Sequence, residues 1–310
     1  MNLISSFPPI PKPGQPVVAT IGFFDGVHGG HRFLIRQVMS VALKSNMNSM
    51  LVTFNVHPRK VMQTDFQPNL LTTTEEKISL LATMGVDYCA LLPFTRQLSD
   101  LTARDFMEKV LFNQLNVRTL IVGYDHHFGH NRTDSFEDYC RYGRELGMEV
   151  LRADAFVKEG QNISSSLIRR LLNEGEIARA SRCLGYNYFM DGHVISGQQI
   201  GRKIGFPTAN FQVNKSDKLI PADGVYAVKV HVDNNVYAAM LNIGFRPTIG
   251  ENSVRTIEAH LLHFEGNLYD SSLRIEFIER IRGEKKFDSW EELADQIKKD
   301  ATLAESLLDN

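Results

Sequence analysis

The sequence contains few cysteines and no excess of charge of either sign. Its three cysteines, Cys89, Cys140 and Cys183, are scattered along 310 residues and form no Cys-x-x-Cys pair. This pattern argues against a disulfide framework and is typical of a reducing compartment. The 34 Lys and Arg residues nearly balance the 36 Asp and Glu residues. The net charge therefore gives no reason to expect nucleic acid or an anionic membrane as a partner.

Long apolar runs, internal repeats and low-complexity segments are also lacking. No run approaches the roughly 20 apolar residues that cross a bilayer. The first 15 residues are proline-rich and contain no apolar signal core. We therefore expect a cytoplasmic protein with neither a membrane nor a nucleic-acid partner. The hydrophobic content of 43% is that of an ordinary globular protein, and the length favours two domains.

The first half alternates between strand and helix patterns. Apolar strand candidates at 17–21, 50–54, 86–92, 117–123 and 150–151 are separated by segments with helical spacing. This alternation predicts an α/β domain with a parallel, Rossmann-like sheet and a ligand at the carboxyl ends of its strands. The segment 102–115 is one of the predicted amphipathic helices, with Phe106, Val110 and Leu111 on one face.

The stretch from Gly22 to His31 follows the first predicted strand and opens a predicted helix. It holds four glycines and two histidines three residues apart. Glycines let backbone amides approach a ligand, and a helix N-terminus favours anions. The pattern therefore indicates a polyphosphate site, although a plain polar turn or a metal site at His28 and His31 remains an alternative. The phosphate-contacting candidates are Gly22, Phe24, Asp25, Gly26 and Gly30.

Three more polar segments belong to this predicted domain. Asn55 to Pro58 follows the second strand. The segment 123–130 contains Asp125, His126, His127 and His130, which indicate either a metal site or a solvated polar loop. Ser164, Ser165 and Ser166 with Arg169 open a predicted helix, where hydroxyls and a cation favour a second anion site. A serine N-cap without a ligand is the alternative there.

From about Tyr188 the apolar residues alternate at period two, which predicts an all-β module, a small barrel closed on itself. Two hairpins are predicted, 225–232 with 236–243 and 256–263 with 273–281. A last helix is predicted to be capped by Ser289. We therefore expect domains at 1–183 and 184–310.

The predicted barrel contains a second group of candidate residues. In the stretch 201–210, Thr208 and Asn210 offer oxygen ligands to a hard cation. Glu258 lies in an alternating segment whose apolar set, Ile257, Ala259 and Leu261, is expected in the core. Glu258, His260 and Leu262 would then share the polar face. The alternative for Glu258 is an exposed strand residue that pairs with Arg255 or Arg274.

These motifs resemble two known groups of enzymes. Residues 22–31 resemble the His-x-Gly-His signature of nucleotidyltransferases, and 164–169 resembles their Ser-Ser-Thr-x-Ile-Arg triphosphate loop. Residues 201–210 match the Gly-Arg-x-x-Gly-Phe-Pro-Thr-Ala-Asn motif of riboflavin kinases. From about Ile21 to Asp300 the chain is similar to the bacterial bifunctional riboflavin kinase/FMN adenylyltransferases, also called FAD synthetases.

The resemblance implies a nucleotidyltransferase domain, followed by an antiparallel barrel of riboflavin-kinase type with a terminal helix. It also implies two reactions, phosphorylation of riboflavin to FMN and adenylylation of FMN to FAD, with ATP as co-substrate and Mg²⁺ as cofactor. It assigns Glu258 as general base, His28 and His31 to the transferring phosphate, and Thr208 and Asn210 to the metal. The remaining implied contacts are ATP or phosphate at Asp125, Ser164, Ser165, Ser166, Arg169, Gly201, Lys203, Gly205 and Pro207, and flavin at His57, Pro58, Pro93, Phe94 and Arg246.

Five residues depart from the family pattern. They are Asn55, where an acidic residue is frequent, His126, where Phe is common, and His263, Asn267 and Asp270 in the barrel. Three other functions fit the sequence less well. The flavin-kinase motifs of the barrel argue against a related adenylyltransferase for pantetheine phosphate or nicotinate nucleotide, and Glu258 beside Thr208 and Asn210 argues against a flavin-storage protein. A nucleic-acid-binding barrel would need a basic, aromatic surface that the sequence lacks.

Overall fold

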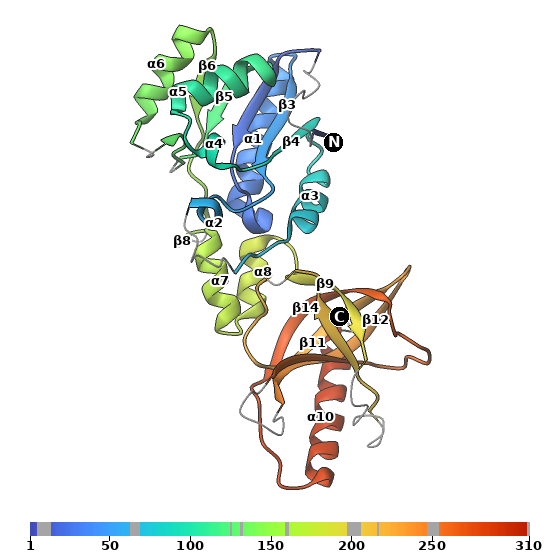
Figure 1. The fold of residues 1–310 in the computed structure, drawn as a ribbon. Helices are drawn as coiled ribbons and strands as arrows, with labels where there is room; N and C mark the ends of the chain where they lie inside the picture. The colour runs from blue at the N-terminus through green and yellow to red at the C-terminus, as the bar shows by residue number, and fades with distance from the viewer. Residues whose placement is uncertain are drawn as a thin grey trace. The chain divides into compact units, whose positions relative to one another are not determined.

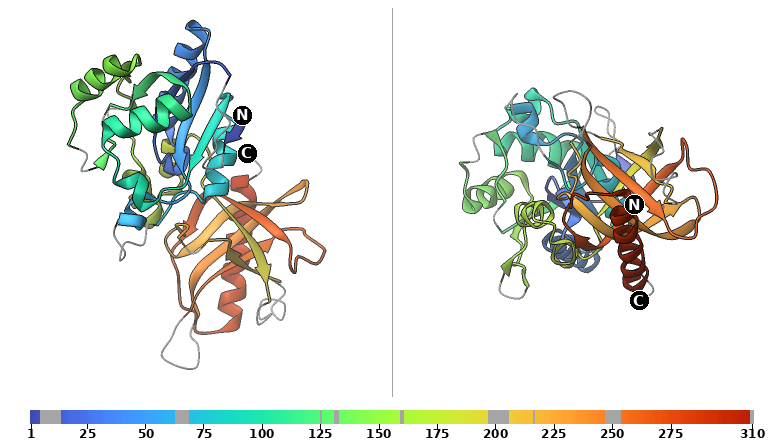
Figure 2. Two further views of the ribbon diagram at one scale, coloured as in Figure 1. Left: turned by 45° about the horizontal axis from the view of Figure 1, so that its top comes forward. Right: turned by 90° about the horizontal axis from the view of Figure 1, so that it is seen from below.

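The computed structural model of the chain describes residues 1–4, 14–62, 69–124, 126–130, 133–158, 161–196, 206–215, 217–246 and 254–308. By its internal contacts the chain divides into two units, Met1–Ser164 and Ser165–Asn310. Figures 1 and 2 show the α/β architecture of the first unit and the barrel of the second. The domain boundary at 183 and 184 remains a prediction from the change of sequence pattern.

The first unit is built on a six-stranded sheet in which all neighbouring strands are parallel. The predicted α/β class is therefore confirmed. The strands are β1 (Asn2–Ile4), β2 (Val17–Ile21), β3 (Asn48–Phe54), β4 (Tyr88–Leu92), β5 (Val117–Val122) and β6 (Glu149–Arg152), in the order β1-β4-β3-β2-β5-β6. The edge strand β1 was not predicted, because three residues are too few to show a periodicity.

The order of strands reverses beside β2. The chain continues from β2 to β3 and β4 on one side, and later to β5 and β6 on the other. In open α/β sheets such a reversal leaves a crevice at the carboxyl ends of the strands, where ligands bind. The loops that follow β2 and β5 therefore lie at the position favoured for a ligand.

Helices cover both faces of this sheet. Alternate residues of β2 point in opposite directions, so that Val18 packs with α1 (Gly29–Lys44) while Ala19 packs with the helices of the other face. The short elements near the sheet are η1 (Asp25–Val27), α2 (Pro58–Met62), α4 (Arg96–Ser99), α5 (Ala103–Asp105), β7 (Val157–Lys158) and β8 (Gln161–Asn162). Two longer helices begin with capping boxes, α3 (Thr74–Ala82) with Thr73 and Glu76 and α6 (Phe136–Leu146) with Ser135 and Asp138.

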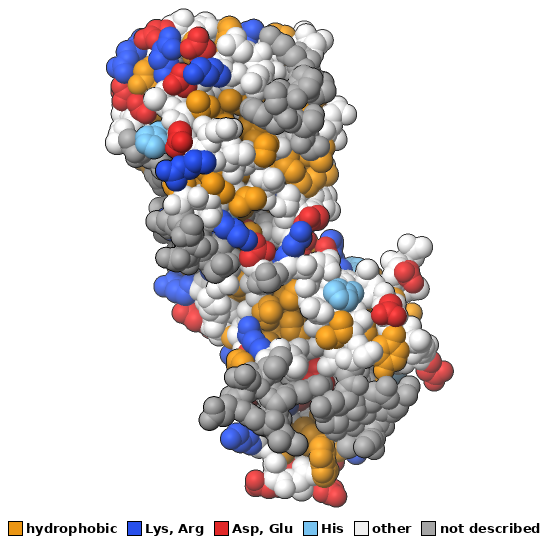
Figure 3. Space-filling view, in the orientation of Figure 1, with side chains coloured by type: hydrophobic (Ala, Val, Ile, Leu, Met, Phe, Trp, Pro, Cys, Tyr) orange, Lys and Arg blue, Asp and Glu red, His pale blue; other side chains and the backbone are white. Residues whose placement is uncertain are grey.

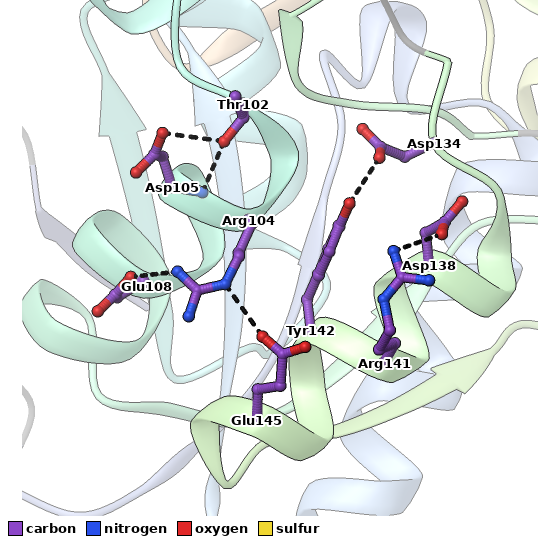
Figure 4. Close-up of polar contacts among 9 residues, drawn as sticks. All are labelled: Thr102, Arg104, Asp105, Glu108, Asp134, Asp138, Arg141, Tyr142 and Glu145. Carbon is purple, nitrogen blue, oxygen red and sulfur yellow. Dashed lines mark hydrogen bonds and ion pairs between the residues drawn. The ribbon is translucent and has the colours of Figure 1, made fainter.

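The predicted α-helix over 102–115 is only partly correct. After α5, residues Phe106–Gln114 form a π-helix, η2, which ends with a bond from the Leu115 N–H to the Val110 carbonyl. The predicted apolar residues are buried, so the face was right and the hydrogen-bond period was wrong. Figure 4 shows Arg104 between Glu108 and Glu145, with N···O distances of 2.8 and 3.1 Å, where α5 and η2 meet α6.

Charges of both signs are interspersed at the end of the first unit that carries α6 (Figure 3). The ion pairs of Arg104 with Glu108 and Glu145 are exposed to solvent, so they contribute little to stability. No helix among the described residues is long and apolar enough to cross a membrane.

The second unit contains a closed six-stranded barrel, as predicted. Its strands are β9 (Phe189–Ile195), β10 (Ala209–Val213), β11 (Gly224–Val232), β12 (Asn235–Arg246), β13 (Val254–Leu261) and β14 (Ser272–Arg282), in the order β10-β13-β12-β11-β14-β9. The β11–β12 hairpin is confirmed. The second predicted hairpin is wrong, because β13 pairs with β12 and β10, whereas β14 pairs with β11 and β9.

Among the described residues of this unit, helices come before and after the barrel strands. The helices α7 (Ser165–Asn173) and α8 (Ile177–Leu184) follow one another, and α8 packs against β14. The last helix, α10 (Trp290–Leu308), is capped by Ser289, whose Oγ accepts from the Glu292 N–H. It lies against β11 and β12 and buries Ala304 in a cluster with Met240.

Candidate functional site

The loop after β2 holds a backbone conformation that side chains disfavour. Phe24 has a φ of 56° and the β-branched Val27 a φ of 38°. Such strain persists only where the surroundings enforce it, and it is concentrated at functional sites. The buried Asp25 carboxylate supplies part of that enforcement by accepting the backbone N–H groups of Leu71 and Thr72 at 3.0 and 3.1 Å.

His28 and His31 lie together at the start of α1. Their rings stack with centroids 3.6 Å apart, and His28 caps the helix by accepting the His31 N–H through Nδ1. In a neutral ring that bond leaves the proton of His28 on Nε2, as a donor. Among the described residues, no hydrogen-bond partner lies within reach of the buried Nδ1 of His31. Burial, and then the neighbouring His28, hold the pKa of His31 well below its usual value.

The loop after β5 contains the histidine cluster, but its histidines have separate surroundings. His127 Nδ1 lies 3.1 Å from the Asp134 carbonyl oxygen, and His130 Nδ1 lies 3.2 Å from that of Ser99. His126 instead contributes to the lowered pKa of His31. No group of three His, Cys, Asp or Glu side chains in the described part of the chain is arranged to hold a metal ion.

The loops after β3 and β4 are tied to each other and to the β2 loop. The Asn55 side-chain oxygen accepts the Phe94 N–H at 3.2 Å. Asn55 thus has a structural use here that needs no charge. The ring of His57 packs edge-on against Phe23, with centroids 4.8 Å apart, and the next residue, Pro58, is buried at the start of α2.

Ile163, just before the predicted serine segment 164–166, lies close to the loop that holds His28 and His31, here called the histidine loop. A Cβ added to Gly30 would lie 3.6 Å from the Ile163 carbonyl oxygen and 3.3 Å from the His28 ring. The segment that leads into Ser164 therefore passes beside the two histidines. The predicted residues Ser165, Ser166 and Arg169 lie in α7, in the second unit.

The candidate kinase residues meet where β10 and β13 pair. Asn210 is the register partner of Glu258, and the Thr208 hydroxyl donates to Glu258 Oε2 at 3.2 Å. Thr256, on the same strand as Glu258, donates to Oε1 at 3.4 Å. Three oxygen-bearing side chains predicted from the sequence, Thr208, Asn210 and Glu258, are therefore brought together.

The two arginines named in the alternative for Glu258 contact other carboxylates. Arg255 Nε donates to Asp223 at 2.7 Å, and Arg274 makes a two-point contact with Asp191 at 2.7 and 2.9 Å. The three apolar neighbours of Glu258 are buried as predicted.

Leu262 corrects the predicted polar face of β13. It was expected on that face beside Glu258, but it lies one residue beyond the end of β13 and is buried in the cluster that contains Ala304 of α10.

Two residues near the sites received no role from the sequence patterns. His260 Nδ1 lies 2.8 Å from the Pro207 carbonyl oxygen, so it holds the segment that leads to Thr208. Its position two residues after Glu258 was the available signal. Lys77 is buried on α3 beneath the β2 loop. A lysine inside an apolar helical pattern could have drawn attention to it.

Some predicted site residues lie outside the described part of the chain. They are Asp125, Gly201, Lys203, Gly205 and the side chain of Arg246. His263 and Asn267 have structural contacts of their own, with Glu305 Oε1 at 2.7 Å and with the Tyr269 N–H at 3.0 Å. Asp270 adopts a positive φ of 60°.

Two family models match the chain, one in each half. The model described as FAD synthetase matches residues 10–167, and the model described as riboflavin kinase matches residues 184–308. Both agree with the motifs identified from the sequence.

Curated relatives match nearly the whole chain. The bifunctional riboflavin kinase/FMN adenylyltransferase of Escherichia coli (strain K12) is 36% identical over 293 residues, which cover 94% of this chain and 93% of the relative. The Listeria monocytogenes protein of the same description is 37% identical over 284 residues, with 91% and 90% covered. A solved structure titled macrolide-efflux protein from Streptococcus pneumoniae has a TM-score of 0.86 and 30% identity, with 94% of both chains covered. With two matching models in the same order and this extent of identity, the chain belongs to the family of bifunctional riboflavin kinase/FMN adenylyltransferases.

Proposed function

We propose that this chain converts riboflavin to FAD in two ATP-dependent steps at two separate sites. The barrel phosphorylates riboflavin to FMN and releases ADP. The α/β unit then joins FMN to AMP from a second ATP and releases pyrophosphate. The observation that carries the proposal is the convergence of Thr208, Asn210 and Glu258 where β10 and β13 pair.

In the first step Glu258 acts as the general base. The primary hydroxyl of the riboflavin side chain is a poor nucleophile until a positioned group takes its proton. Glu258 receives that proton as the hydroxyl oxygen attacks the γ-phosphate of ATP, and ADP leaves. His260 supports the site through its contact with the Pro207 carbonyl oxygen.

Mg²⁺ fits the oxygen ligands of this site. Hard cations prefer oxygen ligands, and Thr208 and Asn210 supply a hydroxyl and an amide oxygen next to a carboxylate. These two residues would hold the ion together with the ATP phosphates. When bound, Mg²⁺ neutralises charge on the phosphates that are transferred and released.

In the second step the nucleophile is an FMN phosphate oxygen. That oxygen already bears negative charge, so the reaction needs positioning and charge stabilisation rather than a general base. It attacks the α-phosphorus of ATP, a new P–O bond forms, and the bond to pyrophosphate breaks. His28 and His31 donate to the α-phosphate oxygens, while the glycine-rich backbone receives the phosphates. Ser164, Ser165, Ser166 and Arg169 hold the outer phosphates, and Asp125 contributes to the nucleotide pocket.

The flavin of FMN contacts the loops after β3 and β4, at His57, Pro58, Pro93 and Phe94. In the barrel, Arg246 contacts the flavin, and Gly201, Lys203, Gly205 and Pro207 contact ATP. The partners are the small molecules riboflavin, FMN and ATP rather than nucleic acid or a membrane. The compartment is the cytoplasm, where ATP is available.

The proposal is tested by incubating the protein with riboflavin, ATP and Mg²⁺ and separating the flavins over time. We expect FMN to appear first and FAD to follow. A second reaction supplied with FMN and ATP alone should give FAD without a lag. If neither FMN nor FAD forms, the proposal is wrong. Phosphopantetheine, offered in place of FMN, should not be adenylylated.

A further inference from the structure

Lys77 is a charged side chain that is almost completely buried in the first unit. It lies on α3 and is 1% exposed. Lysine is rarely buried to this extent, because removing an ammonium group from water is costly unless its protons find acceptors. Here Nζ donates to the carbonyl oxygens of Phe23 at 3.0 Å and Phe54 at 2.8 Å. It also lies 4.0 Å from the centre of the Phe23 ring.

These two carbonyls lie at the carboxyl ends of two neighbouring strands. Phe54 is the last residue of β3, and Phe23 follows the end of β2. The histidine loop begins directly after Phe23, and the segment with His57 begins directly after Phe54. Lys77 therefore ties together the starting points of the two loops that carry candidate residues for adenylyl transfer.

The start of α3 contributes further anchors to the same loops. Asp25 of the histidine loop accepts the backbone N–H groups of Leu71 and Thr72, just before the helix. The Thr74 hydroxyl donates to the Asn55 carbonyl oxygen at 2.9 Å. A strained loop needs such external support to keep one conformation. Lys77 differs from these anchors because it also brings a positive charge.

Burial lowers the pKa of Lys77 to about 8, with Asp25 acting in the opposite direction. The ammonium is therefore protonated at pH 7. The groups facing it are Asp25 on η1, Cys89 on β4 and His31 on α1. Burial raises the pKa of Cys89 to about 11, and the pKa of His31 is lowered well below its usual value.

We propose that Lys77 is a positioning residue for adenylyl transfer. Its ammonium fixes the ends of β2 and β3 relative to each other and places a positive charge behind the loop that receives the ATP phosphates. This inference rests on the proposed function of the first unit. It predicts that both the hydrogen bonds and the charge of Lys77 matter for FAD formation and that neither matters for riboflavin phosphorylation.

The test compares Lys77→Met and Lys77→Arg with Lys109→Met in the full-length protein. Methionine keeps the length of the side chain but loses the charge and the donors. Lys109 is an exposed lysine of the same unit that pairs with Asp105. We expect Lys77→Met to lower kcat/KM for FMN adenylylation by roughly tenfold to a hundredfold, the scale of a displaced site. Lys77→Arg should recover part of this loss, and Lys109→Met should equal the wild type.

The pH profile separates a positioning role from a merely structural one. For the wild type, kcat/KM for adenylylation should fall above about pH 8 as Lys77 loses its proton. This fall should be absent in Lys77→Met, whose activity is already low. It should also be absent in Lys77→Arg, because arginine stays protonated. Riboflavin phosphorylation, measured on the same samples, should show none of these differences.

Three outcomes would overturn the inference. They are adenylylation by Lys77→Met within twofold of the wild type, an equal loss of both activities, and a wild-type profile that is flat from pH 7 to 9.5. The wild-type pH profile needs no variant, so it tests the inference even if both variants fail to fold. A failure of the proposed function itself is distinguishable, because the wild type would then form no FAD at any pH.

Discussion

At the scale of single residues, Glu258 carries the proposed kinase chemistry. Glu258→Gln keeps the shape and the hydrogen-bonding capacity of the side chain but removes the base. We expect riboflavin phosphorylation to fall by roughly a hundredfold to ten-thousandfold, the contribution of a general base. Riboflavin binding, the melting temperature and the adenylylation of supplied FMN should stay near wild type.

Steady-state assays of both reactions check the prediction for Glu258→Gln, with exposed Glu291→Gln as the control. Kinase turnover within a fewfold of wild type would return Glu258 to a structural role.

The stacked pair His28 and His31 should serve only the second reaction. His31→Ala is expected to slow FAD formation from FMN by about a hundredfold or more, the effect of losing one transition-state donor. Because His28 also caps α1, His28→Asn is a cleaner variant than alanine, since asparagine preserves the cap. His127→Ala, which removes an exposed histidine of the same unit, is the matched control. A parallel loss of riboflavin phosphorylation in folded His31→Ala would contradict the two-site assignment.

Sequence patterns identified most candidate residues but not those that hold them in place. Glu258 was found because alternation along a strand assigns its face, and His28 because glycines and histidines after a strand favour phosphate. Lys77 and His260 escaped because their contacts are with backbone carbonyls far away in sequence, and no local pattern marks such a contact. Leu262 was misplaced because alternation assigns faces only within a strand, and β13 ends at Leu261.

At the scale of elements, α10 is fastened to the barrel by a buried ion pair. Asp300 is 3% exposed and accepts from Arg282 Nε at 3.0 Å and from a terminal nitrogen at 2.8 Å. Removing one partner of such a pair leaves the other charge without compensation. We expect Asp300→Ala to destabilise the second unit by about 3 kcal/mol. Asp295→Ala, which removes an exposed aspartate of the same helix, should change little.

Scanning calorimetry measures this effect on the intact chain. A loss of about 3 kcal/mol corresponds to a decrease of roughly 10 °C in the melting temperature of a unit of this size. The transition of the first unit should not move. An unchanged transition for the second unit would mean that α10 contributes nothing to the stability of the barrel.

The elements themselves were predicted unevenly, for physical reasons. The parallel sheet and the Ser289 cap of α10 follow from local periodicity and from a side chain that bonds nearby backbone. The pairing of β13 and β14 does not, because a turn between two strands shows only that the chain reverses. Closure of the barrel selects the actual partners, which lie far apart in sequence. The π-helical period of η2 was likewise not visible in the spacing of its apolar residues.

At the scale of the whole molecule, the contacts of α7 and α8 suggest how the chain can be divided. The Leu172 carbonyl oxygen accepts the Ala222 N–H at 3.0 Å, and a Cβ on Gly175 would lie 2.6 Å from the Arg280 side chain. We expect the fragments 165–310 and 184–310 both to phosphorylate riboflavin. The longer one should melt at a higher temperature because it keeps these contacts. Equal melting temperatures would show that α7 and α8 do not support the barrel.

The central claim is that one chain holds two independent sites, and mixing two inactivated variants tests it most directly. Given riboflavin, ATP and Mg²⁺, Glu258→Gln should form neither FMN nor FAD, while His31→Ala should stop at FMN. Mixed in one tube, the two proteins should form FAD, because FMN released by one is adenylylated by the other. FMN added to Glu258→Gln alone should give the same product. If the mixture forms no FAD while Glu258→Gln converts added FMN, FMN does not pass between molecules. If Glu258→Gln cannot adenylylate added FMN, the two sites are not independent and the account is contradicted.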